Sequence, residues 1–201
     1  EDGTGPADLA VHATHRAVEA AGIELKDIEF IIFATLNPDY FFPGSACVLQ
    51  EKLGLPGVGA LDVRNQCSGF IYSLSIADAF IKTGMYKRIL VVGAEVHSSG
   101  LEFADRGRDV TVLFGDGAGA VILGATDDNR GILSTHLHAD GRYAKELWIE
   151  IPAARLMPRV TFELLQEGRH YPKMNGKRVF KFAVEKLPEV INEALQANGL
   201  T

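Results

Sequence analysis

The chain has 201 residues, of which 47% are hydrophobic and 23% charged, a composition typical of a globular protein. Its formal net charge of −6 at pH 7 argues against general binding to nucleic acid. No apolar run has the length needed to cross a bilayer, and two cysteines, Cys47 and Cys67, are too few for a disulfide framework. We therefore expect a cytoplasmic protein with no membrane or nucleic-acid partner.

Helices and buried strands alternate along the first 125 residues. Periodic apolar residues predict helices at residues 9–21, 45–53 and 70–82. Short apolar runs predict strands at residues 28–35, 58–63, 88–94, 110–114 and 118–125. Such alternation indicates an α/β protein with a mainly parallel core sheet.

A polar, turn-rich segment at residues 126–130 is the best internal boundary, so we expect one domain over 1–126 and a second over 131–201. The second begins with a predicted strand at 132–138 and ends with a helix at 179–197. The intervening region, 141–172, is expected to be irregular. Residues 19–23 also resemble residues 195–200 when Gly22 is aligned with Gly199, which predicts a duplicated half whose second copy is incomplete.

Cys67 lies in the turn between the predicted strand at 58–63 and the predicted apolar helix at 70–82. A strand-to-helix turn projects its side chain out of the sheet, and the start of a helix stabilises a thiolate. Gly69 lets substrate or backbone approach closely. The alternative is a small buried cysteine packed as a hydrophobic residue, but the turn context favours a nucleophile.

Two clusters of charged or ligating side chains leave alternatives open. A basic island with no acidic residue among its members consists of Arg169, Lys173, Lys177, Arg178 and Lys181. It either docks an acidic or phosphorylated partner or forms a solvated face. His136 and His138 alternate along a predicted strand next to Asp140, but a metal site needs more convergent ligands, so strand and turn roles are favoured and no metal is expected.

Four motifs in order carry a resemblance to a known family. They are Asp62 to Phe70 (DVRNQCSGF), Asp105-Arg106-Gly107, Phe114 to Gly119 (FGDGAG), and Met174-Asn175-Gly176 followed by Val179-Phe180-Lys181. The chain resembles β-ketoacyl-[acyl carrier protein] synthase III, of the thiolase superfamily. The resemblance implies a thiolase-like layered αβαβα fold with a nearly complete first half and a truncated second half.

The resemblance implies an acyltransferase in which Cys67 takes the acyl group of a short acyl-CoA and passes it to malonyl-carrier protein with loss of carbon dioxide. This decarboxylative condensation starts type II fatty-acid synthesis and needs no cofactor beyond the CoA thioester. The Cys67 backbone N–H would supply one oxyanion donor. None of the six histidines matches the family's catalytic histidine, so we expect that this chain alone cannot complete the condensation.

The resemblance also assigns residues around the nucleophile and implies a homodimer. Phe42 matches the phenylalanine that closes the partner's acyl pocket, and Arg106 the arginine that packs on the CoA adenine. The acyl-pocket and pantetheine walls would be formed by Val112, Leu113, Phe114, Met174, Gly176 and Phe180. Docking of the acidic acyl carrier protein is assigned to Lys177, Arg178 and Lys181.

Two alternatives to this functional interpretation remain open. One is a related synthase of secondary metabolism with a longer acyl substrate, and the other a catalytically inert fragment or partner subunit. A dinucleotide-binding oxidoreductase is excluded because the glycine-rich segment Gly115–Gly119 precedes a strand instead of linking a strand to a helix.

Overall fold

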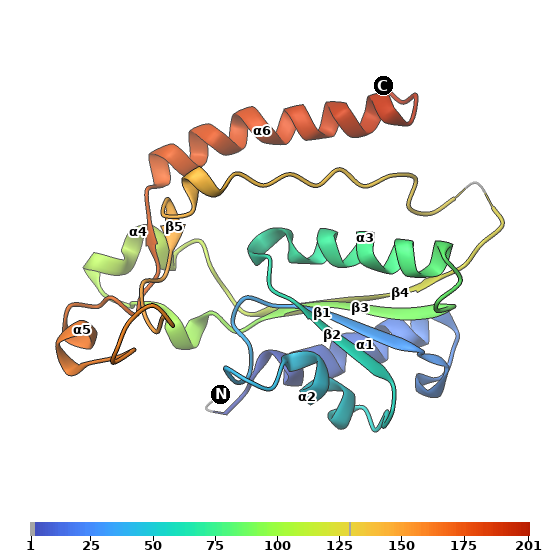
Figure 1. The fold of residues 1–201 in the computed structure, drawn as a ribbon, viewed down its shortest axis with the longest axis horizontal. Coiled ribbons are helices and arrows are strands. Elements are labelled where there is room, and N and C mark those ends of the chain that lie inside the picture. Colours follow the sequence, from blue (N-terminus) through green and yellow to red (C-terminus); the bar gives the residue numbers. More distant parts are fainter. Residues whose placement is uncertain (1–2, 129) are drawn as a thin grey trace. The chain divides into compact units, whose positions relative to one another are not determined.

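The computed structural model describes residues 3–128 and 130–201. Glu1 and Asp2 of the first expected domain, and Asn129 of the expected boundary segment, lie outside the described residues. The chain forms two compact units, one from residues 1–96 and 115–135 and the other from residues 97–114 and 136–201 (Figure 1).

The first unit is built on a four-stranded sheet with the order β2-β1-β3-β4. Its strands are β1 (Phe30–Ala34), β2 (Gly59–Val63), β3 (Arg88–Glu95) and β4 (Gly117–Gly124). β1 pairs in parallel with both β2 and β3, whereas β4 runs antiparallel to β3. The expected mainly parallel α/β sheet is therefore confirmed, and the three parallel strands end at one common edge.

Helices cover both faces of this sheet. The helices α1 (Pro6–Ala21) and α2 (Ser45–Lys52) pack on one face, and α3 (Gly69–Lys82) packs on the other (Figure 1). Because successive strand residues point to opposite faces, Ile31 and Phe33 join the core beneath α1 and α2, while Ile32 joins the core beneath α3. β1 is buried on both sides, which explains its uninterrupted apolar sequence. A short 3₁₀ helix, η1 (Leu25–Asp27), connects α1 to β1.

The strand predicted at residues 110–114 is wrong. The segment belongs to the second unit, where residues 110 and 111 end the short helix α4 (Arg108–Thr111), which follows the 3₁₀ helix η4 (Asp105–Gly107). Residues 112–114 are neither helix nor strand. The Leu113 N–H donates to the Val110 carbonyl at 2.9 Å, and the Thr111 hydroxyl donates to the Glu102 carbonyl at 2.8 Å. These local bonds satisfy the backbone in a turn, so the β-branched composition does not decide the conformation.

The strand predicted at residues 132–138 is also wrong. The described residues of this segment are assigned neither helix nor strand. A β-ladder requires a neighbouring backbone edge, and the part of the chain that the structure describes pairs no strand with this segment. Its apolar and polar alternation is therefore not sufficient to make a sheet strand here.

The second unit consists of short elements and one long helix. After η3 (Ser98–Gly100), η4 and α4 come η5 (Gly141–Tyr143), β5 (Leu147–Trp148), α5 (Phe162–Gln166), β6 (Lys173–Met174) and α6 (Gly176–Ala197). β5 and β6 form an antiparallel pair. The helix α6 begins at its cap Asn175, whose side chain accepts from the Arg178 N–H at 3.4 Å.

The two aligned glycines adopt the same conformation at the ends of two helices. Gly22 follows α1 with φ 63°, and Gly199 lies just beyond α6 with φ 64°. In both places the residue after the glycine donates its N–H back into the helix, Ile23 to Val18 at 3.3 Å and Leu200 to Leu195 at 2.9 Å. The sequence similarity between these segments therefore corresponds to a shared left-handed helix end.

Candidate active site

Cys67 lies in a turn at the edge where the parallel strands end. β2 ends at Val63, the 3₁₀ helix η2 (Gln66–Ser68) holds the cysteine, and α3 begins at Gly69. Gln66 has φ 44°, which makes it a non-glycine residue in the left-handed region. Such a backbone is uncommon and clusters at functional sites. The Cys67 side chain is exposed, so the thiol can be reached from solvent.

A depression of about 310 Å³ surrounds the thiol within the first unit. Its lining comprises Ala34, Gln66, Cys67, Phe70, Gly93, Ala94, Glu95, Gly117, Ala118 and Gly119. Gly117 and Gly119 belong to the glycine-rich motif, and a Cβ at either position would meet no atom within 4 Å. Gly93, in contrast, has little free space beside it, because a Cβ there would lie 3.2 Å from the Phe70 side chain. The motif glycines therefore leave open space beside the cysteine.

Three carboxylates that sequence reasoning did not single out hold the backbone of this unit. Asp62 accepts the Ala46 N–H at 3.1 Å at the start of α2, and Asp39 accepts the Ala7 N–H at 3.4 Å at the start of α1. Glu95 accepts N–H groups of the turn after β1. The available signal was an acidic residue near the end of a predicted apolar strand, as at Asp62 and Glu95.

Asp62 is an exposed residue of β2 whose carboxyl is partly desolvated where it meets the start of α2, and this environment acts on its ionisation in two opposing ways. Burial raises the pKa of this carboxyl above its usual 3.8, while hydrogen bonds from the N–H groups of Ala46 and Ser45 lower it less strongly. A Cβ at Gly44 would collide with the Asp62 carboxylate. Gly44 is thus required for the close approach of the α2 start to the aspartate.

Phe42 lies apart from the Cys67 depression in the first unit. It projects from the loop before α2 with 81% of its surface exposed, next to exposed Tyr40 and Phe41. The rings of Phe41 and Phe42 stand edge to face with centroids 6.3 Å apart. Cys47, in the first turn of α2, is exposed as well and lines a separate depression of about 670 Å³ with Asp8, Asp39 and Lys52 among others.

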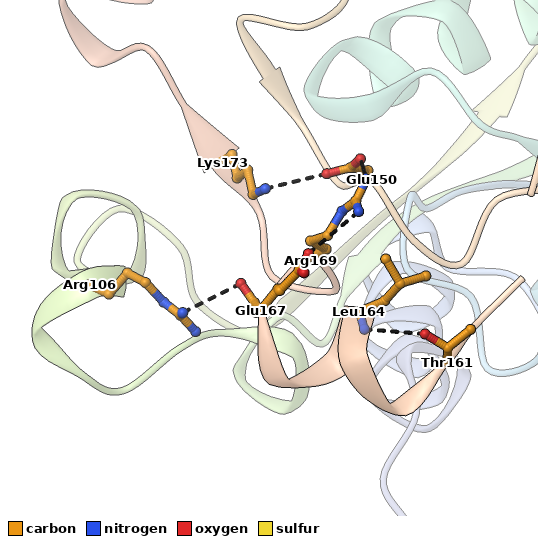
Figure 2. A network of polar contacts seen from close by, with 7 residues as sticks. All are labelled: Arg106, Glu150, Thr161, Leu164, Glu167, Arg169 and Lys173. Carbon is orange, nitrogen blue, oxygen red and sulfur yellow. Dashed lines mark hydrogen bonds and ion pairs between the residues drawn. The ribbon is translucent and has the colours of Figure 1, made fainter.

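Arg106 belongs to a network of polar contacts in the second unit (Figure 2). Its guanidinium pairs with the Glu102 carboxylate at 2.5 Å and donates to the Glu167 carbonyl at 3.4 Å. The hydrogen bond to Glu102 raises the pKa of Arg106, and the same bond lowers the pKa of Glu102. The side chain expected to pack on adenine is therefore engaged with protein groups here.

The residues expected to line the acyl pocket are largely exposed in this unit. Val112 and Leu113 have exposed side chains, and the Phe114 ring contacts the His97 ring at 5.1 Å between centroids. Met174 is in β6, and its methyl would lie 3.5 Å from a Cβ at Gly176. Phe180 is exposed on α6.

Most of the basic island is neutralised by acidic residues from elsewhere in the second unit. Arg169 pairs with Glu150 and Glu167, and Lys173 reaches Glu150 at 3.3 Å (Figure 2). Arg178 pairs with Glu146 at 3.0 Å. Among the described residues, Lys177 and Lys181 are the island's two members in no ion pair, and both are exposed one turn apart on α6. The basic island therefore contains one lysine pair, Lys177 and Lys181, whose charge is not neutralised by an ion pair among the described residues.

His136 and His138 share one carboxylate. Their ring nitrogens lie 3.1 and 2.7 Å from the two oxygens of Glu193 on α6. Both rings therefore reach the same carboxylate, although these residues form no strand. Across residues 3–128 and 130–201, no group of three His, Cys, Asp or Glu side chains is arranged to hold a metal ion. Nor is any helix of those residues long and apolar enough to span a membrane.

Comparisons with known proteins agree on one family. Residues 61–141 match the family described as 3-oxoacyl-[acyl-carrier-protein (ACP)] synthase III. A β-ketoacyl-[acyl-carrier-protein] synthase III of Xanthomonas euvesicatoria is 47% identical over 96% of this chain and 57% of its own length. The 3-oxoacyl-[acyl-carrier-protein] synthase III structure from Aquifex aeolicus has a TM-score of 0.85 at 37% identity, covering 98% of this chain and 58% of that one.

A polyketide enzyme shares the fold at lower identity. The priming β-ketosynthase of the R1128 polyketide pathway has a TM-score of 0.81 at 28% identity, over 100% of this chain and 58% of that one. The chain thus spans 57–58% of the length of these three proteins. The expected thiolase-like α/β fold is confirmed by these structures.

Proposed function

The chain belongs to the β-ketoacyl-[acyl-carrier-protein] synthase III family, and from this premise we propose that Cys67 accepts the acyl group of a short acyl-CoA. The observation that carries the proposal is the exposed thiol in a strained turn beside a glycine-lined depression at the sheet edge. The thiolate sulfur bonds to the thioester carbonyl carbon, the bond from that carbon to the CoA sulfur breaks, and CoA leaves as a thiolate that takes up a proton.

The second step of the proposed reaction is a decarboxylative condensation. Malonyl-carrier protein loses carbon dioxide, and the carbanion that remains attacks the carbonyl carbon of acyl-Cys67. The new carbon–carbon bond forms as the carbon–sulfur bond breaks, which returns the Cys67 thiolate and yields β-ketoacyl-carrier protein. No resident cofactor is required, because the leaving carboxylate supplies the electron pair.

The remaining assignments belong to the same proposal. Val112, Leu113, Phe114, Met174, Gly176 and Phe180 are proposed to contact the acyl and pantetheine parts of the substrate. Arg106 is proposed to hold the CoA adenine, which requires it to leave Glu102, and Phe42 to cross a homodimer interface, for which its 81% exposure leaves room. We further propose two thiolase-like halves, 1–126 and 131–201, and a cytoplasmic location.

Carrier docking is proposed to centre on Lys177 and Lys181. These lysines have no acidic partner among the described residues, so their charge is available to an acidic carrier protein. Arg178 is the weaker candidate. Its guanidinium pairs with Glu146 and lies 5.1 Å from the Tyr143 ring centroid, which supports a role in holding α6.

The proposal is tested by condensation with acetyl-CoA and malonyl-carrier protein, using the full-length protein and its Cys67→Ala and Cys47→Ser variants. Radiolabelled carbon dioxide release and acetoacetyl-carrier protein formation are measured together. We expect both from the unsubstituted protein and from Cys47→Ser, and no acetoacetyl product from Cys67→Ala. Equal product formation with Cys67→Ala would contradict the proposed nucleophile.

A further inference from the structure

Glu95 ends β3 at the sheet edge and lines the Cys67 depression. Its carboxylate accepts the Leu36 N–H at 2.7 Å on one oxygen and the Asn37 N–H at 3.2 Å on the other. The Thr35 hydroxyl donates to that second oxygen at 3.1 Å. A single carboxylate therefore satisfies three donors of the turn that follows β1.

The same turn is tied to both neighbouring strands. The Thr35 N–H donates to the carbonyl of Val63, the last residue of β2, at 3.3 Å. On the other side, the Asn37 side-chain amide donates to the Val96 carbonyl at 2.5 Å. Backbone donors that leave the end of a strand need partners, and an ionised carboxylate is a strong one. Glu95 is thus the central acceptor of the turn.

The turn at residues 35–37 directly follows Ala34, the residue on which the start of α3 packs. Gly69, two residues after Cys67, starts α3 against Ala34, the last residue of β1. A Cβ at Gly69 would lie 3.2 Å from the Ala34 Cβ and 3.8 Å from the Val63 carbonyl oxygen. Because a side chain at position 69 would already crowd Ala34, the backbone at the start of α3 packs closely on the end of β1, and we expect a displacement of that end to shift the start of α3 and the cysteine before it.

We infer that Glu95 is a positioning residue for acyl transfer. By fixing residues 35–37 it holds the end of β1, and so keeps the Cys67 backbone N–H in place as an oxyanion donor. The inference rests on the proposed function and adds to it a residue that supports the nucleophile from a different strand. Since an oxyanion donor acts only when preorganised, losing this support slows the chemical step and not substrate binding.

The test compares two reactions of one thiol in the full-length protein and its Glu95→Gln variant. Single-turnover acetylation by acetyl-CoA passes through a tetrahedral oxyanion, whereas alkylation by iodoacetamide displaces iodide directly and forms none. Glutamine has the shape of glutamate but keeps one acceptor oxygen, and its NH₂ faces a donor. We expect the maximal acetylation rate to fall about ten- to hundredfold, with half-saturation by acetyl-CoA and the alkylation rate each changing less than about threefold.

Two further variants calibrate the result. Thr35→Val removes one hydroxyl, which donates to Glu95 and accepts the Asn37 N–H at 3.2 Å, so acetylation should fall about two- to fivefold. Glu19→Gln, on the exposed face of α1, should change neither reaction. Thermal unfolding shows which variants are folded. If Glu95→Gln does not fold, the acetylation and alkylation rates of Thr35→Val are compared instead.

The possible outcomes distinguish a positioning role of Glu95 from a purely structural role and from failure of the proposed function. Unchanged acetylation in the folded variant, or equal loss of acetylation and alkylation, would overturn the positioning role while leaving the proposed function standing. If the unsubstituted protein is alkylated at Cys67 but never acetylated, the proposed function fails and the inference fails with it.

Discussion

The two units of the chain use carboxylates in opposite ways. In the first unit, Asp62 and Glu95 accept backbone N–H groups near the ends of the strands β2 and β3. In the second, Glu150 and Glu102 pair with arginine and lysine side chains on the surface. The first arrangement fixes the backbone at the sheet edge where Cys67 lies, and the second joins segments that have little buried core between them.

The same contrast appears in how the carboxylates titrate. Burial raises the pKa of Asp62, so folding favours its protonated form. The Arg169 guanidinium, with Lys173, lowers the pKa of Glu150 to about 2, so folding favours its ionised form. Raising the pH therefore weakens the contribution of one carboxylate and strengthens that of the other. This difference can be tested one side chain at a time.

The largest expected effect is on the core of the first unit. Phe33 is fully buried beneath α1 and α2, so Phe33→Ala should lower the free energy of unfolding by about 3–5 kcal/mol. Phe162→Ala, which removes an equal ring that is 70% exposed in the second unit, should change it by less than about 0.5 kcal/mol. Urea unfolding measures both, and equal losses would show that the second unit is as well packed as the first.

The next effect concerns the Asp62 cap on α2. Asp62→Ala leaves the Ala46 N–H without its acceptor and should cost about 1–2 kcal/mol. Asp62→Asn keeps an acceptor and cannot ionise. Because the folded pKa of Asp62 is raised, its contribution to stability is present below 3.8 and is lost as pH rises through the folded value. Relative to the unsubstituted chain, Asp62→Asn should therefore gain stability over that rise, and a constant difference across pH would contradict the raised pKa of Asp62.

A smaller effect is expected on carrier-protein binding. Lys181→Glu should raise the KM for malonyl-carrier protein about five- to tenfold at low salt, and Lys177→Glu comparably, with the difference shrinking as salt is added. Lys82→Glu makes the same charge change on α3, where the lysine already pairs with Asp78, and serves as the control. An unchanged KM for Lys181→Glu would remove the lysine pair from the docking surface.

The smallest effect on stability is expected from the surface pairs of the second unit. A more sensitive measurement of these ion pairs is the titration of the Glu150 carboxyl group, followed by NMR of its side-chain carboxyl carbon. The pKa should lie near 2 in the unsubstituted chain and move toward 4.5 in Arg169→Gln. Since the folded pKa is lowered, the contribution of this group is present above 4.5 and lost as pH falls toward 2. A Glu150 pKa that does not respond to Arg169→Gln would show that the pair is not formed in solution.

The first unit was predictable from sequence to a large extent. Buried parallel strands have long apolar runs, so β1 and β3 were located to within two residues at each end. The position of Cys67 followed from the strand before it and the helix after it. The support from Glu95 did not follow, because the turn donors it binds are 58–60 residues away in sequence.

The second unit was less predictable for physical reasons. Residues 110–114 have strand composition, yet their backbone is satisfied within a helical turn held by Thr111 and Glu102. Charge patterning found the basic island but not its partners, since Glu146 and Glu150 come from a segment without regular periodicity. Only the pairing shows that Lys177 and Lys181 differ from their basic neighbours.

The most direct test of the central claim is the mass of the intact protein and its peptides after brief exposure to acetyl-CoA. Cys47 and Cys67 are both exposed, so the chain contains its own control. The account predicts an added mass of about 42 Da, one acetyl group per active chain, on the peptide that contains Cys67 and none on the peptide that contains Cys47. Acetylation of both cysteines alike, or of neither in the folded protein, would contradict it.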